Sequence, residues 1–315
     1  MSDKYLPVRV STFRGDTKIK FNIYVKVAGK QILLCREGDS FEGHRLERLR
    51  GKKLSRLFIP AEQLPAYEDY LAKNLEEAFA EGDRYPTELR LQIAHGLLQS
   101  ATEDLMESPG DETLYLATKT RVERFLKLFM REPSTLHFFL NIRNVDYSVA
   151  QHGVNVAALS LAIAHEVPAA EQRALQLVPM VMGALLHDIE HTYNNIDFSL
   201  PKDRLSKAEQ ALHKKHAMAG YERLNQYTHF DPLTLIVISE HEENIDGSGP
   251  RGKHERDLDL LSMVVAAANA FDHYLLNENL TLKETLKKML IDKMGLIHLE
   301  AMRGLQEALK KREII

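Results

Sequence analysis

Residues 183 to 191 read GALLHDIEH, and they join an apolar run to a cluster of ionisable side chains. Small and apolar residues lead directly into His187 and Asp188, and His191 follows three positions after the aspartate. An apolar run of this kind is typical of a buried helix. Buried polar groups cost folding free energy unless hydrogen bonds or a metal ion satisfy them. The pair is therefore either an ordinary helix end that meets solvent or one half of a metal site.

Other apolar segments of the C-terminal half carry polar residues that can bind metal. They are His152 in HGVNVAALSLAIAHEV, His216 on a helix entered through Ser206 and Glu209, His241 at the end of LTLIVISEH, and Asn269 and Asp272 one turn apart in VVAAANAFDHYL. Each residue alone is typical of a helix end or a satisfied core position. Their recurrence favours a shared metal, because one centre would satisfy all of them together.

The set of ligand types indicates a class of metal. Imidazoles with a carboxylate, and without thiolate, suit iron, manganese, zinc or nickel and disfavour calcium. An aspartate beside a histidine can bridge two ions, since each carboxylate oxygen can serve one of them. Paired ions about 3.5–4 Å apart are a common arrangement for hydrolysing phosphate esters.

Composition excludes several other classes of protein. The chain has 315 residues, of which 44% are hydrophobic and 27% charged, as in a folded globular protein. Its one cysteine, Cys35, rules out disulfides and thiolate clusters within the chain. A net charge of -4 gives no reason to expect a nucleic-acid polymer as partner. No apolar run suggests a membrane span, and the start MSDKYLPVRV lacks the apolar core of a signal peptide, so we expect a cytoplasmic protein.

The first part of the chain predicts a small β-rich domain. Residues 18 to 35 alternate between apolar and polar side chains, which indicates a hairpin with its turn at residues 28 to 30. Further strands are expected near residues 8 to 12 and 54 to 59, and a helix over residues 63 to 79. A basic cluster in this domain is either a solvated face or a patch for phosphate or an acidic partner. It consists of Arg45, Arg48, Arg50, Lys52, Lys53 and Arg56.

Helical patterns follow from residue 88 to residue 130, with a break at Ser108-Pro109-Gly110-Asp111, and from about residue 145 to the C-terminus. We therefore predict three segments: a β-rich domain with a trailing helix over residues 1–85, a helical connector over 86–140, and an all-α domain over 141–315. The fold class is α+β.

The order of the metal-capable motifs resembles that of the HD-GYP proteins, HD-superfamily hydrolases that cleave the second messenger cyclic di-GMP. The resemblance covers about residues 145 to 290, and the N-terminal domain is similar to the small β domain that often precedes this module. The family's opening histidine falls on His152, its His–Asp pair on His187 and Asp188, and its next histidine on His216. The resemblance therefore implies an HD-type helical bundle that holds a metal centre.

The signature loop of the family, H-H-E-x-x-D-G-x-G-Y-P, is altered in this chain, where residues 241 to 250 read HEENIDGSGP. Aligned through its glycines, the loop has His241 at the first histidine and Glu242 at the second. The tyrosine is deleted between Gly249 and Pro250. A second register would pair Glu240 with the first histidine, but it needs an insertion.

Other positions also depart from the family pattern. The last metal aspartate falls on Asn269, so Asp272, one turn later, is a rival ligand. His191 replaces a lysine that touches phosphate. Ser148 stands where family members with three metals have a glutamate, and the basic residues that follow the last metal helix are missing from LLNENLTLKET.

The resemblance implies a metal-dependent phosphodiesterase that hydrolyses cyclic di-GMP, with weak activity because signature residues are missing. Two divalent ions are expected, with iron as the first choice and manganese as the alternative. The expected metal ligands are His152, His187, Asp188, His216, His241, Glu242, Asn269 and Asp272. Asp188 and His191 are the expected catalytic residues, and His191 and Arg251 are expected to contact substrate.

Two alternatives remain open from the sequence. The first is a signalling module that responds to cyclic di-GMP or binds a protein, and that keeps the metal site with little or no turnover. The second is a phosphohydrolase of the same superfamily that acts on another phosphoester. In each case the N-terminal domain is a candidate site for protein partners.

Overall fold

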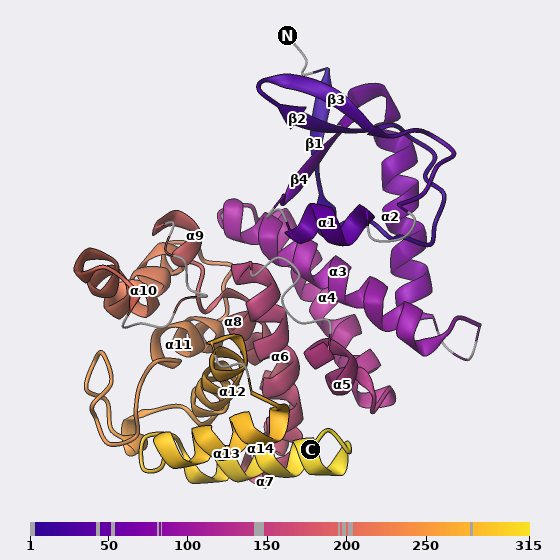
Figure 1. The fold of residues 1–315 in the computed structure, drawn as a ribbon. Coiled ribbons are helices and arrows are strands. Elements are labelled where there is room, and N and C mark those ends of the chain that lie inside the picture. Colours follow the sequence, from indigo (N-terminus) through magenta and orange to yellow (C-terminus); the bar gives the residue numbers. More distant parts are fainter. Residues whose placement is uncertain are drawn as a thin grey trace. The chain divides into compact units, whose positions relative to one another are not determined.

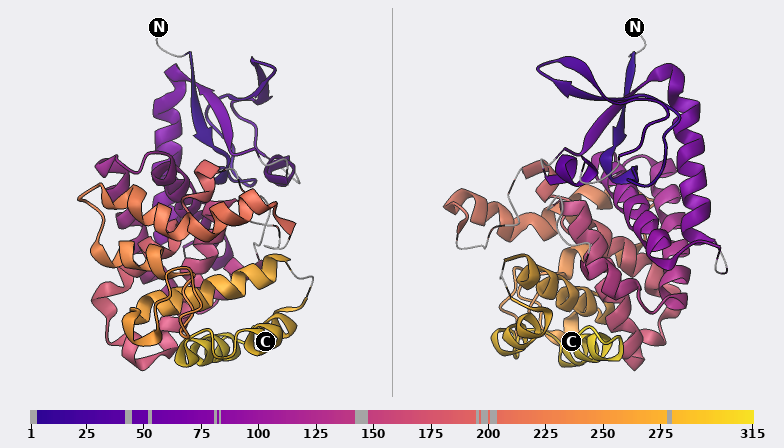
Figure 2. Two further views of the ribbon diagram at one scale, coloured as in Figure 1. Left: turned by 90° about the vertical axis from the view of Figure 1, so that its left-hand side faces the viewer. Right: turned by 45° about the vertical axis from the view of Figure 1, so that its right-hand side comes forward.

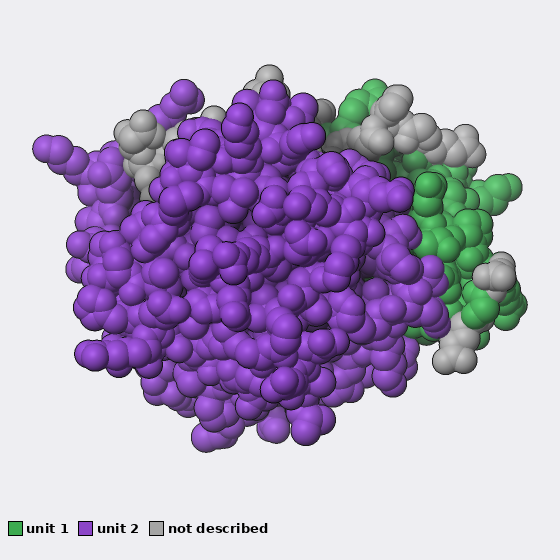
Figure 3. Space-filling view, turned by 90° about the horizontal axis from the view of Figure 1, so that it is seen from below, with its two compact units in different colours: residues 1–100, 142–148 green, residues 101–141, 149–315 purple. Residues whose placement is uncertain are grey.

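The computed structural model describes residues 4–41, 45–51, 54–80, 82, 84–141, 148–194, 196, 200, 204–277 and 280–315. The chain forms two compact units, coloured separately in Figure 3: residues 1–100 with 142–148, and residues 101–141 with 149–315. The first contains a four-stranded antiparallel sheet, and the second is built from helices. The predicted fold class, α+β with a small β-rich domain followed by a helical bundle, is confirmed.

The sheet of the first unit has the strand order β1-β4-β2-β3. Its strands are β1 (Tyr5–Arg9), β2 (Ile23–Val27), β3 (Lys30–Cys35) and β4 (Arg56–Pro60). The predicted hairpin is β2 and β3, and its turn places Ala28 and Gly29 at φ values of 49° and 77°. Two consecutive positive φ angles are what a tight two-residue hairpin turn requires. The strand expected at residues 8 to 12 begins earlier, and residues 10 to 12 form a 3-10 turn instead.

One face of this sheet is covered by helix α2 (Leu64–Phe79), as Figure 1 shows. Phe21 meets Tyr67 and Tyr70 edge-on, with ring centroids 5.6 and 5.8 Å apart. Offset edge contacts of this kind are the favoured geometry for aromatic pairs. The alternating apolar residues of the sequence thus form the core between sheet and helix.

The remaining helices follow in chain order. They are α1 (Arg45–Gly51), α3 (Thr87–Glu107), α4 (Glu112–Arg131), α5 (Thr135–Asn141), α6 (Val149–Glu166), α7 (Pro168–Glu171), α8 (Leu177–Leu186), α9 (His191–Asn194), α10 (Lys207–Asn225), α11 (Pro232–Glu240), α12 (Leu260–Asn277), α13 (Leu282–Asp292) and α14 (Leu299–Lys311). The predicted break at residues 108 to 111 separates α3 from α4. There Asp111 accepts hydrogen bonds from two backbone N–H groups and caps α4. The predicted capping box of Ser206 and Glu209 begins α10.

Helix α6 lies at the centre of the second unit and packs against α8, α12 and α14 (Figures 1 and 2). Helix α8 also packs against α11, and α11 against α10. Gly153 allows α6 and α8 to approach closely, because a Cβ atom there would lie 2.5 Å from the carbonyl oxygen of Leu185. Gly183 does the same for α8 and α11, where a Cβ would lie 2.6 Å from Val237. These contacts bring His152, next to Gly153, toward the end of α8 where His187 lies.

Two further predictions concern surface features. Of the basic cluster, Arg45 donates a hydrogen bond to the carbonyl oxygen of Leu34 at 2.5 Å. The side chains of Arg50, Lys52 and Lys53 lie outside the described residues. Among the described helices, none combines the length and hydropathy that a membrane crossing needs.

Candidate metal centre

The metal-capable residues predicted from the sequence converge at one place in the second unit. Helix α6 supplies His152, the end of α8 supplies His187 and Asp188, α10 supplies His216, the end of α11 supplies His241 and Glu242, and α12 supplies Asn269 and Asp272. All are buried except Glu242, which is partly exposed.

Asp188 lies in the middle of this group and faces histidines with each of its two oxygens. Its Oδ1 lies 3.0 Å from the Nε2 atom of His216 and 3.5 Å from that of His241. Its Oδ2 lies 3.4 Å from the Nε2 atom of His187 and 3.6 Å from that of His152. We call these the Oδ1 side and the Oδ2 side. One carboxylate thus reaches two separate pairs of imidazoles.

Backbone carbonyl groups fix the orientation of three of these rings. His187 and His241 each donate from Nδ1 to the carbonyl oxygen three residues earlier, at 2.8 Å, and His216 makes the same contact. A carbonyl oxygen can only accept, so Nδ1 carries the proton in each ring. In the neutral imidazole the Nε2 lone pair is then exposed toward Asp188. Metal-binding histidines are commonly held by this kind of second hydrogen bond.

His152 is held in the same way, but by a carboxylate. Its Nδ1 donates to Oδ2 of Asp272 at 2.7 Å, while its Nε2 lies 3.0 Å from Oδ1 of Asn269. Asn269 therefore shares the Nε2 face of the ring with the centre, and Asp272 lies behind the ring. The two residues thus meet different nitrogens of His152.

In the neutral form of the rings, the inward-facing nitrogens cannot satisfy one another. The Nε2 atoms of His216 and His241 are 2.9 Å apart, and those of His152 and His187 are 3.2 Å apart. With the protons on Nδ1, each pair brings two acceptors together and has no hydrogen to share. Oδ2 of Asp188 also accepts no hydrogen bond from the described residues. A cation on each side of Asp188 would satisfy these acceptors.

The pKa values at the centre shift in different directions, and burial lowers that of His241 to about 4. Burial alone would raise the pKa of Asp188, but the neighbouring histidines, His187 and His191 first, outweigh it and hold the pKa well below its usual range. Burial would lower the pKa of His152, yet its hydrogen bond to Asp272 raises it. The pKa of His216 is raised against burial by Asp188. A proton or a metal ion can supply the positive charge that the ionised carboxylate of Asp188 favours.

The donor atoms fit a divalent transition metal. Among the described residues, four groups of three side chains have ligand atoms within 4.8 Å of one another. These groups are His187, Asp188 and His241; His152, Asp188 and His273; His216, His241 and Glu242; and His191, His213 and His216. Nitrogen and carboxylate oxygen without sulfur is the set expected for iron, manganese or zinc.

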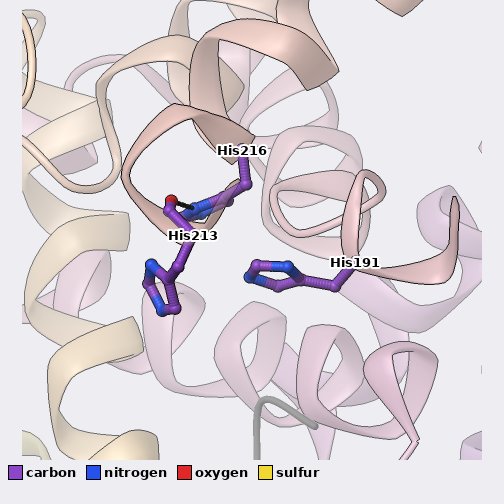
Figure 4. Close-up of side chains that lie close together, drawn as sticks. All are labelled: His191, His213 and His216. Atoms are coloured by element: carbon purple, nitrogen blue, oxygen red, sulfur yellow. Dashed lines mark hydrogen bonds between the residues drawn. The ribbon is translucent and has the colours of Figure 1, made fainter. Parts of the chain in front are cut away.

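His191 lies beside Asp188 at the start of a separate helix. Helix α8 ends at Leu186, so His191 does not continue it but begins the short helix α9. A turn hydrogen bond from its backbone N–H to the carbonyl of Asp188 still brings its Nε2 to 3.7 Å from Oδ1 of that residue. In Figure 4 its ring points toward those of His213 and His216, with centroids 5.1 and 4.4 Å away. Burial lowers the pKa of His191 to about 3, which keeps the ring neutral near pH 7.

Glu240 and Glu242, the glutamates that the two registers place differently, differ in their surroundings. Glu240 accepts hydrogen bonds from Lys253 Nζ at 2.5 Å and from Ser262 Oγ at 2.6 Å, as well as from a backbone N–H group. Its charge is therefore already compensated by structural partners. Glu242 instead belongs to a group with the two histidines of the Oδ1 side. This difference favours the register that aligns His241 and Glu242 with the family's histidine pair.

The loop that follows is shaped by glycine. Gly247 has a φ of +82°, a conformation that other residues adopt only with strain. Asp246 accepts hydrogen bonds from both the backbone N–H and the hydroxyl of Ser248. A Cβ atom on Gly249 would lie 2.7 Å from the Cα of Glu243. The Asp-Gly-Ser-Gly sequence is thus needed for the path of the chain itself.

Two histidines at the centre, His213 and His273, were not singled out from the sequence. His213 lies one turn before His216, and His273 one turn after Asn269, so helical spacing alone could have found both. The ring of His273 lies 4.7 Å from that of His152. Arg251 is exposed and donates to the hydroxyl of Ser239 at 3.1 Å, and it is in none of the ligand groups.

Residues 149–274 match the HD domain family. The chain is similar to a solved structure described as Bd1817, a HDG"Y"P protein from Bdellovibrio bacteriovorus, with 36% identity and a TM-score of 0.91 over 97% of this chain and 99% of that one.

Curated relatives match over shorter stretches. The cyclic di-GMP phosphodiesterase PdeB of Borreliella burgdorferi is 26% identical over 128 residues, which cover 40% of this chain and 33% of that protein. A cyclic di-GMP phosphodiesterase of Thermotoga maritima is 28% identical over 196 residues, which cover 58% of this chain and 51% of that protein. The matched part thus spans between a third and about half of the length of these relatives.

Proposed function

The chain belongs to the HD-GYP family, and from that premise we propose that it is a metal-dependent phosphodiesterase that hydrolyses cyclic di-GMP. Relatives named as cyclic di-GMP phosphodiesterases support this substrate. The observation that carries the proposal is the placement of Asp188 between two pairs of imidazoles whose acceptor nitrogens face each other.

Two divalent ions, iron or manganese, would be held on the two sides of Asp188. His152, His187 and Asn269 would serve the ion on the Oδ2 side. His216, His241 and Glu242 would serve the ion on the Oδ1 side. Asp272 would orient His152 without touching metal, so in this assignment it is a positioning residue.

When bound, such a pair of ions lowers the pKa of water and offsets the charge that builds up on phosphate during hydrolysis. Asp188 directs one oxygen toward each side, so that both sets of ligands would lie next to the same phosphate. His152 and His216 lie within helices, and His187 and His241 lie at helix ends. Because these helices fix the rings, little rearrangement is needed when substrate binds.

His191 and Arg251 are the proposed substrate contacts from the sequence. His191 is neutral near pH 7, so it would donate one hydrogen bond to phosphate and would not replace the charge of the family's lysine. Arg251 keeps N–H groups beyond its contact with Ser239 and would reach substrate from the loop. A neutral group in place of lysine, together with the deleted tyrosine, supports weak turnover.

The test is cyclic di-GMP hydrolysis by the full chain loaded with iron or manganese, with metal content measured on the same sample. Product that disappears with a chelator and returns with metal supports the proposal. Tight binding of cyclic di-GMP without product would favour a signalling module instead. Hydrolysis of other phosphoesters without cyclic di-GMP binding would favour a different phosphohydrolase.

A further inference from the structure

A cavity of about 440 Å³ adjoins the Oδ1 side of the metal centre. Its lining includes His213 and Glu242. His213 belongs to the histidine group of Figure 4, and Glu242 to the group with His216 and His241. The cavity is therefore continuous with the proposed metal ligands. Its size is within the range of pockets that hold small molecules, roughly 300–1,000 Å³.

Two lysines from different elements line this cavity. Lys214 comes from α10, next to His213, and Lys293 follows the end of α13. Neither ammonium group has a hydrogen-bond or ion-pair partner among the residues that the structure describes. Both can therefore bind an anion without breaking an existing contact.

Other basic side chains near the centre are already paired. Arg223 donates to both oxygens of Glu190, at 2.9 and 3.1 Å. Lys253 is held by Glu240 at 2.5 Å. Recruiting either one to a substrate would leave a carboxylate without its partner, which is costly in a partly buried setting. This contrast favours Lys214 and Lys293 as the cations that meet a ligand.

Residues of the altered signature loop also line this cavity. They are Asn244, Ser248, Gly249 and Pro250. Between Gly249 and Pro250 the family pattern has a tyrosine that this chain lacks. Small residues thus border the cavity where a large aromatic side chain would otherwise stand, and they leave room for a ligand beside the lysines.

We propose that Lys214 and Lys293 bind the second phosphate of the cyclic dinucleotide, the one that is not cleaved. The inference rests on the proposed function, because it needs the first phosphate to lie at the metal centre. A cyclic dinucleotide carries two phosphodiesters, and the cavity lies beside the place where one of them would react. These lysines thus partly replace the basic residues missing after α12 in binding the nucleotide. They attract a phosphate as charged groups, and salt screens them because Lys214 is exposed and Lys293 is partly exposed.

The test measures equilibrium binding of cyclic di-GMP to the metal-loaded full chain by calorimetry, at low and at high salt. Lys214→Ala and Lys293→Ala should each weaken binding on the order of 10-fold at low salt, and the double variant more. The dependence of affinity on salt should become smaller in each variant, while metal content stays the same. Lys215→Ala and Lys287→Ala are the matched controls, since both are exposed lysines on the same two elements that do not line the cavity.

A substrate with a single phosphate separates this role from a direct effect on the centre. Replacing the two lysines should lower the hydrolysis of bis(p-nitrophenyl) phosphate about 10-fold less than it lowers the hydrolysis of cyclic di-GMP. Equal losses for both substrates would overturn the assignment, and so would lysine variants that bind cyclic di-GMP within twofold of wild type. If wild type itself does not bind cyclic di-GMP, the proposed function fails, and this inference fails with it.

Discussion

Replacing Asp272 by asparagine tests how the centre is built. Oδ2 of Asp272 accepts the proton of His152 Nδ1 at 2.7 Å, and both side chains are only 1% exposed. Asparagine keeps the shape and can still accept this hydrogen bond through its carbonyl oxygen, but it removes the charge. Loss of such a partner behind a metal-binding histidine typically weakens metal affinity by about 10–100-fold. This corresponds to about 1.4–2.8 kcal/mol, so Asp272→Asn should still bind two ions, but more weakly.

The assay is competition for metal against a chelator of known affinity, with metal content measured at saturation. Asp259→Asn is the matched control, because it removes an ion pair with Arg173 at the other end of the same helix. The control should keep the affinity of wild type. Loss of one ion at saturation in Asp272→Asn would show that Asp272 is itself a ligand. Affinity within twofold of wild type would show that it does not position His152, and either result would refute the reasoning.

Three further outcomes are expected. Glu242→Gln should lower metal affinity, whereas Glu240→Gln should keep the metal affinity of wild type and lower the melting temperature. In Glu240→Gln a buried acceptor loses charge-assisted hydrogen bonds worth about 1.5–3 kcal/mol each. Equal metal loss in both variants would contradict the register. His191→Ala should keep both ions and lower hydrolysis. Since burial lowers the pKa of His191 to about 3, its charged form exists only below that pH, so the wild-type and alanine pH–rate profiles between pH 5.5 and 8.5 should have the same shape; a step lost with His191 would argue for a charged role. Turnover of cyclic di-GMP should stay well below the roughly 10 per second of a typical enzyme, and a rate at that level in steady-state assays would refute weak activity.

Most of the fold could be predicted because its signals are local. The alternation of Ile19, Phe21 and Ile23 marked the buried side of the first unit, and all three are in its core. The break at residues 108 to 111 was marked by Pro109 and Gly110, whose effects on the backbone need no tertiary context. The sequence also placed the end of an apolar helix at His187 and Asp188, and α8 ends at Leu186 with His187 as its C-cap.

The centre was predictable wherever one polar residue interrupted an apolar run, as at His152, His187 and His241. It was not predictable where two candidates shared a helix face. Asn269 and Asp272 lie one turn apart, and they differ in which nitrogen of His152 each one meets. Such a difference depends on the orientation of one ring, which the packing of α6 against α12 determines and the sequence of either helix alone does not.

The most direct test of the metal centre is elemental analysis of the full chain purified without oxygen, for wild type and Asp188→Ala. Because the two oxygens of Asp188 face two separate pairs of histidines, the account predicts about two ions per chain in wild type and almost none in the variant. Wild type with almost no bound metal, or an alanine variant that retains both ions, would contradict it.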